Sequence, residues 1–135
     1  MTLPPLSLLA RVLVPATVLA VALAGPASAA SWTTVVKAGG ARSQACKVSV
    51  QDGRAWRLYV RLVNNEDVRF ESTYSVSQGG RTVDQAKLAA RAGQTSAVKS
   101  VVIRRNGTQK LGAGISGDGG GLGDSDIQLS GIGRC

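Results

Sequence analysis

The side chains that could perform catalysis lack a common partner, because the sequence contains no histidine. This absence excludes Ser-His-Asp and Cys-His nucleophilic catalysis and every metal site with a histidine ligand. One pair, Ser96 and Lys99, does match the Ser-x-x-Lys pattern. In enzymes with this pattern the serine opens a helix of a much larger domain, whereas an extended segment directs residues three positions apart to opposite faces. We therefore expect no catalytic residue here.

Four acidic residues, Glu66, Asp67, Glu71 and Asp84, are candidates for the paired carboxylates of a glycosidase. No pattern in the sequence brings two of them to opposite sides of a cleft, so solvated strand ends explain them better. A small hydrolase that uses two of these carboxylates is the less favoured alternative to a protein without enzymatic activity.

The glycine-rich stretch from Asp118 to Asp126 carries three carboxylates that could wrap a calcium ion. The calcium-binding nonapeptide, aligned on residues 120–123, has an aspartate where Ser125 stands here, and it occurs in repeats rather than once. We therefore expect a flexible acidic loop, no metal site and no cofactor. Ion binding by this loop stays an open alternative.

Cations and an aromatic ring alternate at Arg57, Tyr59 and Arg61, which places all three on one face of an extended segment. We expect Lys47 beside them, on the neighbouring strand of the same sheet. Such a surface can hold a polyanion through its charges and can stack on a sugar or a base. The simpler interpretation is a solvated face whose arginines pair with Glu71 or its neighbours.

The N-terminal segment predicts export. Its only charged residue before Lys37 is Arg11, which is followed by 13 uncharged residues from position 12 to position 24. Small residues at Ala27 and Ala29 fit the subsites of a signal peptidase, and the apolar core is shorter than the roughly 20 residues of a membrane span. We therefore expect residues 1–29 to be a signal peptide and residues 30–135 to be one secreted, extracellular domain that meets the membrane only during export.

We predict that the exported protein begins at Ala30, or one residue later if the peptidase recognises Ser28 and Ala30 instead. Mass spectrometry of the secreted form measures this directly. A mature mass that still includes Arg11, or a precursor retained in the membrane, would contradict export.

The two cysteines of the sequence, Cys46 and Cys135, predict one disulfide, because an even pair in an exported protein reads as a bridge. Two free thiols or bridges between chains are the alternatives. Without residues 1–29 the chain has 15 Lys and Arg against 8 Asp and Glu, so it is basic. A charge of this size admits anionic partners, but it also serves simply to keep a small protein soluble.

Alternating apolar residues predict strands joined by short turns. The first strand covers residues 32–36, and residues 46–51 and 56–62 form a hairpin. For this hairpin we predict a three-residue loop at 52–54, because that register keeps apolar residues on a common face. It opposes Val50 to Trp56, Val48 to Leu58 and Cys46 to Val60.

Two further hairpins are predicted from their turns. Gly79 and Gly80 should join a strand at 69–78 to one that begins at Arg81, with Val76 opposite Val83. Asn106 and Gly107 should join residues 98–105 to residues 108–115 as a hairpin. Residues 84–91 are equally compatible with a short helix and with a strand. Residues 127–129 are expected to form a last strand that carries Cys135 back towards the first hairpin.

These elements predict an all-β fold, a small antiparallel β-sandwich of roughly seven strands with one disulfide. Trp56, on the strand that follows the one bearing Cys46, resembles the immunoglobulin arrangement of a tryptophan near the disulfide. The resemblance implies an immunoglobulin-like sandwich. The sequence departs from the immunoglobulin pattern because the second cysteine is the last residue and no tyrosine lies two positions before it.

The function expected from these features is binding, without enzymatic activity, to an anionic extracellular polymer or to a secreted protein. A secreted protease inhibitor is the alternative, in which an exposed loop at Arg104-Arg105-Asn106-Gly107 would occupy a protease cleft.

Overall fold

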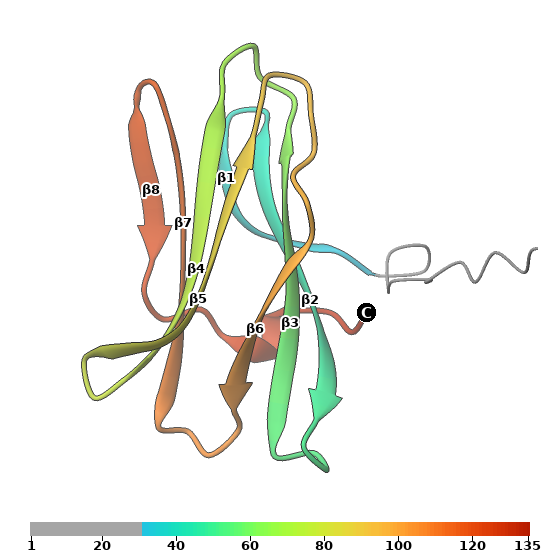
Figure 1. The fold of residues 1–135 in the computed structure, drawn as a ribbon, viewed down its shortest axis with the longest axis vertical. Coiled ribbons are helices and arrows are strands. Elements are labelled where there is room, and N and C mark those ends of the chain that lie inside the picture. Colours follow the sequence, from blue (N-terminus) through green and yellow to red (C-terminus); the bar gives the residue numbers. More distant parts are fainter. Residues whose placement is uncertain (1–30) are drawn as a thin grey trace, which may run out of the picture.

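A computed structural model describes residues 31–135, and the predicted signal peptide and Ala30 lie outside this range. Two antiparallel sheets of four strands face each other, which confirms the predicted β-sandwich with eight strands rather than roughly seven (Figure 1). Sheet 1 contains, in spatial order, β1 (Thr33–Ala38), β2 (Ala41–Val50), β3 (Ala55–Asn64) and β6 (Lys99–Arg104). Sheet 2 contains β5 (Arg81–Ala90), β4 (Phe70–Gln78), β7 (Gln109–Gly117) and β8 (Gly120–Asp124), and a 3-10 turn, η1 (Leu129–Gly131), follows.

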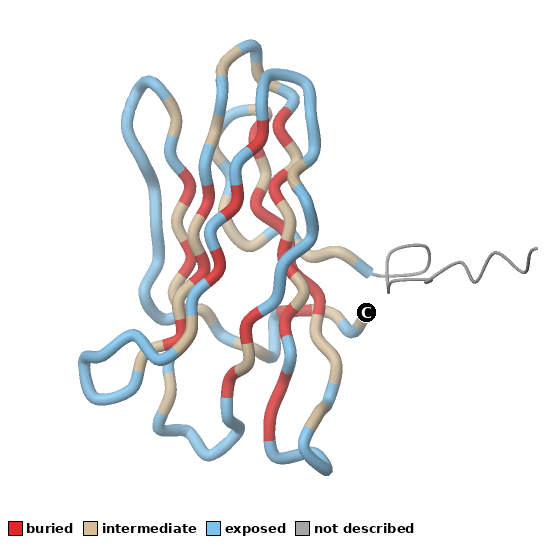
Figure 2. Tube along the Cα trace, viewed as in Figure 1, coloured by how far each residue is buried: buried red, intermediate tan, exposed pale blue. Residues whose placement is uncertain are grey.

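The core lies between the sheets and is built from alternate residues of the central strands. Leu58, Val60 and Leu62 of β3 are fully buried, as are Tyr74 and Val76 of β4. Figure 2 shows buried residues along the middle of the sandwich, whereas the connecting turns and β8 are largely exposed. Burial of each large apolar side chain stabilises the fold by roughly 1.5–3 kcal/mol, so β3 and β4 are its main support.

One chain of hydroxyl groups crosses the core. The Ser43 hydroxyl lies 2.7 Å from that of Ser72 and 2.9 Å from that of Tyr74, and Ser72 donates to the carbonyl of Gly114 at 2.8 Å. Burial raises the pKa of the Tyr74 hydroxyl well above its usual value. The phenol is therefore a neutral hydrogen-bonding group that links β2 to sheet 2.

The predicted register of the β2–β3 hairpin is wrong by one residue. Lys47 pairs with Leu58, and a four-residue turn at 51–54 replaces the predicted three-residue loop. A shift of one residue turns every side chain of a strand to the opposite face. The core side of β2 therefore carries Ala41, Ser43 and Ala45, which are small residues opposite the large side chains of β3.

The β4–β5 hairpin has the predicted two-residue turn, and both Gly79 and Gly80 adopt positive φ angles, of 58° and 77°. Residues 81–90 form a strand, which resolves the choice between helix and strand. A register shift between Val76 and Ser77 places Val76 opposite Asp84 rather than the predicted Val83, whose side chain is 51% exposed.

The predicted hairpin between β6 and β7 is wrong. β6 pairs with β3 in sheet 1 and β7 pairs with β4 in sheet 2, so Asn106 and Gly107 connect the two sheets instead. The turn itself is present, since Gly107 has a φ of 75° and the Asn106 side chain accepts from the Thr108 N–H at 3.1 Å. The prediction failed because residues 101–103 are all apolar, and such a run does not select a face.

The C-terminal segment returns to sheet 1, as expected, but not as the predicted strand at 127–129. Beyond the end of β1, the Lys47 N–H donates to the carbonyl of Gly133 and the Cys135 N–H donates to that of Lys47, both at 3.0 Å. This parallel pairing brings Cys135 to Cys46, and the predicted disulfide is confirmed with a Cα separation of 5.0 Å. Figure 1 shows the C-terminus beside β2.

The position of this disulfide differs from the immunoglobulin arrangement, in which the bridge joins the two sheets. Here it joins β2 to the segment that runs along the same edge of sheet 1. The immunoglobulin-like identity therefore stays a prediction, and the observed fold is a small β-sandwich.

Candidate anion-binding surface

The two sheets differ in charge. The strands of sheet 1 contain seven Lys and Arg residues and no Asp or Glu, whereas those of sheet 2 contain three of each kind. The cations of sheet 1 are Lys37, Arg42, Lys47, Arg57, Arg61, Lys99 and Arg104. Because opposite charges are absent from these strands, the positive potential of sheet 1 is not cancelled within it.

The predicted stripe of Arg57, Tyr59 and Arg61 is present on the outer face of β3, since the intervening residues are buried. Lys47 does not belong to it. The observed register places Lys47 opposite Leu58, on the core side of sheet 1. The predicted set of four is therefore divided into an outer stripe of three and a lysine on the other face.

Other cations join the stripe on the outer face. Arg42 lies opposite Lys37 and Val63, and Arg104 lies opposite Ala55, all on the face that bears Arg57. Lys37 and Arg42 are therefore like charges directly opposite one another on neighbouring strands, an arrangement that destabilises a sheet. We define the outer basic face as Lys37, Arg42, Arg57, Tyr59, Arg61 and Arg104.

Two side-chain contacts hold Arg61 on this face. Its Nε donates to the Gln44 side chain at 2.9 Å, and its guanidinium lies 4.3 Å from the centre of the Trp32 ring. Partial burial, with a smaller contribution from Arg42, lowers the pKa of the Arg61 guanidinium. This arrangement holds a cation and an aromatic surface side by side at the edge of β1.

The acidic residues do not neutralise the outer basic face. Among residues 31–135 the one ion pair joins Arg69 to Glu71 at 2.9 Å, so Glu71 does not pair with the stripe as the simpler interpretation required. Glu66 accepts from the N–H of Gly40. Asp84 accepts from the N–H of Val102 at 2.8 Å and thereby connects the edge strands β5 and β6 of the two sheets.

A second group of cations surrounds Trp56, at the end of the sandwich where the β2–β3 turn lies. Measured to the centre of its ring, the Lys47 amino group lies at 4.9 Å, the Arg105 guanidinium at 4.5 Å and that of Arg134 at 5.3 Å. We define these four residues as the Trp56 cluster. Arg105 lies against this ring, but residues 104–107 of the loop are all exposed, so the protease-inhibitor alternative stays a prediction.

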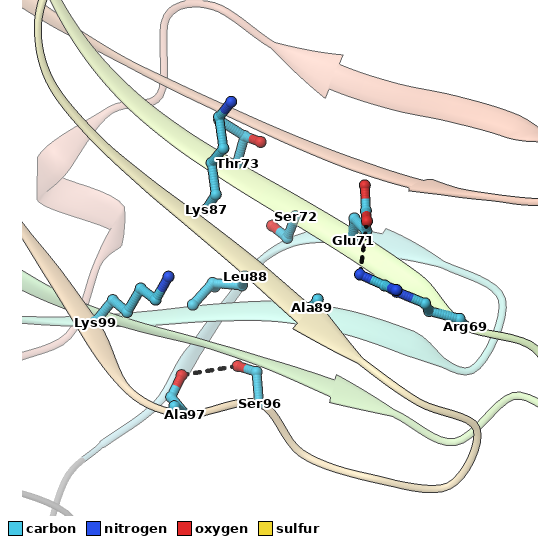
Figure 3. Close-up of a pocket in the computed structure, with 10 residues that line it drawn as sticks. All are labelled: Arg69, Glu71, Ser72, Thr73, Lys87, Leu88, Ala89, Ser96, Ala97 and Lys99. Carbon is cyan, nitrogen blue, oxygen red and sulfur yellow. Dashed lines mark hydrogen bonds and ion pairs between the residues drawn. The ribbon is translucent and has the colours of Figure 1, made fainter.

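The Ser96 and Lys99 pair lines a hollow of about 410 Å³ at the β5 edge of sheet 2, shown in Figure 3. The Ser96 hydroxyl accepts from the Leu62 N–H at 2.8 Å and donates to the carbonyl of Ala97 at 2.9 Å. In Figure 3 the Lys99 side chain does not point towards this hydroxyl. Both hydrogen-bonding roles of Ser96 are thus used to position the backbone.

The remaining candidate sites are dispersed. Asp118 lies in the turn before β8 and Asp124 is the last residue of that strand, so the whole strand, about 13 Å long at 3.3 Å per residue, lies between them. Asp124 accepts from the N–H of Asp126 at 3.0 Å. Within residues 31–135, no group of three or more His, Cys, Asp or Glu residues is placed to hold a metal ion.

Comparisons with protein-family models, with curated proteins and with solved structures found no match to this chain. In the part of the chain that the structure describes, no helix is long and apolar enough to cross a membrane.

Sequence reasoning missed five of the cations that the fold gathers: Lys37, Arg42 and Arg104 on the outer basic face, and Arg105 and Arg134 at Trp56. One signal was available. The chain contains no acidic residue between Asp84 and Asp118, and Asp52 alone stands before Glu66. The segments that precede or separate these acidic residues contain every strand of sheet 1.

Proposed function

We propose that the mature protein is an exported, non-enzymatic binding module that holds an anionic extracellular polymer on its outer basic face. The observation that carries the proposal is the segregation of charge, with only cations on the strands of sheet 1 and a balance of charges on those of sheet 2. A charge that served solubility alone would have no reason to collect on one sheet.

The geometry of the face suits an extended ligand better than a compact one. Arg57 and Arg61 are four residues apart on one strand, about 13 Å, and Arg42 lies on the adjacent strand about 4.8 Å away in the sheet direction. Charges spread at these spacings match groups repeated along a polymer. Tyr59 and Trp32 add ring surfaces on which a sugar or a base can stack.

The test compares two charge reversals with the same effect on net charge. Arg57→Glu with Arg61→Glu changes the outer basic face, whereas Lys87→Glu with Lys110→Glu changes the outer side of sheet 2, since both lysines alternate with buried residues. Fluorescence anisotropy with labelled dextran sulfate measures the affinity. We expect the first variant to bind at least about tenfold more weakly and the second to bind nearly as the unchanged protein does.

Salt provides a further measurement in the same assay. Affinity of the unchanged protein should fall steeply between low and physiological salt, because binding releases the counterions of the polymer. Circular dichroism and urea unfolding show whether each variant is folded. Absence of binding at low salt, or equal losses in the two variants, would contradict the proposal and leave net charge as the explanation.

A further inference from the structure

The Trp56 cluster brings three cations to one buried ring without an acidic partner. Trp56 is 7% exposed, and none of Lys47, Arg105 and Arg134 forms an ion pair within the described residues. Asp52, the acidic residue of the nearby β2–β3 turn, is exposed and forms none either. Three converging positive charges without a counter-charge repel one another, and a bound anion removes that repulsion.

The cations come from three separate segments, and the backbone fixes each segment. Arg134 is next to the disulfide and pairs in parallel with Lys47. The Arg105 N–H donates to the carbonyl of Arg54 at 2.9 Å, and its Nη1 donates to that of Gly53 at 3.1 Å. The Lys47 amino group donates to the carbonyl of Leu129 at 2.5 Å, which uses one of its three donors.

A hollow adjoins the cluster through Arg105. It measures about 510 Å³ and is lined by Gln51, Arg54, Arg104, Arg105 and Asn106. The Nε of Arg54 donates to the carbonyl of Gln51 at 3.0 Å, which holds this side chain at the hollow. The hollow is large enough for a small ligand group, and its charged lining is entirely cationic.

The electrostatics of Lys47 agree with this arrangement. Partial burial lowers the pKa of its amino group, and the charges of Arg134 and Arg105 lower it further. The same three charges that repel one another would all attract an anion placed among them.

We infer that the Trp56 cluster and the adjoining hollow form a binding site for a compact tetrahedral dianion, a phosphate or a phosphate monoester. A tetrahedral dianion directs oxygens towards cations on several sides at once, which suits donors from three segments, whereas a carboxylate presents two oxygens in one plane. Trp56 and Lys47 lie on the core side of sheet 1. The site shares Arg104 with the outer basic face, through the lining of the hollow, but it contains neither Arg57 nor Arg61. It does not rest on the function proposed for that face.

The experiment removes the second tryptophan, so that all of the indole fluorescence comes from Trp56. The sequence has two, so Trp32→Phe leaves Trp56 as the only indole. Inorganic phosphate is titrated into the full mature chain of this variant, with chloride replaced to keep ionic strength constant. We expect a saturable change in the Trp56 emission that chloride alone does not produce.

Charge-neutral substitutions then locate the anion. Arg105→Gln with Arg134→Gln, made in the Trp32→Phe chain, should weaken phosphate binding about a hundredfold, which corresponds to about tenfold for each lost charged hydrogen bond. The matched control, Arg57→Gln with Arg61→Gln, removes the same two charges from the outer basic face. It should change the phosphate affinity by less than about twofold.

Two results would overturn the inference: no saturable change in Trp56 emission, or equal losses from the two double variants. The first is measured without any change to the cluster, so a variant that fails to fold does not decide the question. Glucose 6-phosphate distinguishes the source of the anion. Binding equal to that of inorganic phosphate assigns the site to a terminal monoester, and binding of inorganic phosphate alone assigns it to the free ion.

Discussion

Reduction of the disulfide should lower the free energy of unfolding by about 4–5 kcal/mol, which is a large part of the stability of a domain of this size. The bridge closes a loop of 89 residues between Cys46 and Cys135. Without it the unfolded chain regains the conformations that the closed loop excludes. Urea unfolding of the oxidised and the reduced protein measures the difference.

Reduction isolates the effect of the bond, because it removes no side-chain atom and only adds one hydrogen to each sulfur. Cys46→Ala with Cys135→Ala should cost somewhat more, since Cys46 is fully buried and its truncation also leaves a small cavity. A loss below about 1 kcal/mol on reduction would show that hydrogen bonds hold the C-terminal segment without help from the bridge. If the segment detaches, Arg134 leaves Trp56 and phosphate affinity should fall as well.

Asn64→Ala should lower the free energy of unfolding by about 3–4 kcal/mol. The Asn64 side chain is fully buried, and its amide donates to the carbonyls of Val68, Ala90 and Arg91 at 2.7 to 3.1 Å. Its oxygen accepts from the Glu66 N–H at 2.9 Å. Alanine leaves these backbone groups without partners, in a place where burial makes an unsatisfied polar group costly.

The next residue is a matched control. Asn65 is exposed and no hydrogen bond of its side chain is present, so Asn65→Ala should change the free energy of unfolding by less than about 0.5 kcal/mol. Urea unfolding of the two variants under the same conditions gives the comparison. If Asn64→Ala and Asn65→Ala lower the free energy of unfolding by similar small amounts, water replaces the hydrogen bonds of the Asn64 side chain, and the prediction is wrong.

Asn64 also illustrates what a single sequence hides. Its position at the end of an alternating run is readable, but its partners come from the β3–β4 connection and from the end of β5, up to 27 residues away. No periodicity within β3 carries information about carbonyls on another sheet. Arg105 and Arg134 were missed for the same reason, because they meet Trp56 only after the chain has crossed between the sheets and returned to β2.

The pairing of strands was harder to predict than the strands themselves. Residues 101–103 are clearly β-prone, yet β6 could pair with β7 through the Asn106 turn or complete the free edge of β3. The second arrangement prevails because Val101 and Ile103 then pack into the core between the sheets. The energy that decides the pairing is contributed by residues distant in the sequence.

By itself, the sequence determined the all-β class, the approximate strands, the glycine turn at 79–80 and the disulfide, because alternation, turn chemistry and the count of cysteines are local or compositional properties. Only the tertiary structure decided which face of β2 meets the core, which sheet receives β6, and which cations gather on the outer basic face and at Trp56. The reason is geometric. Alternation defines which residues of one strand share a face, but register and sheet membership depend on packing across the sandwich, and a shift of one residue moved Lys47 from one face to the other.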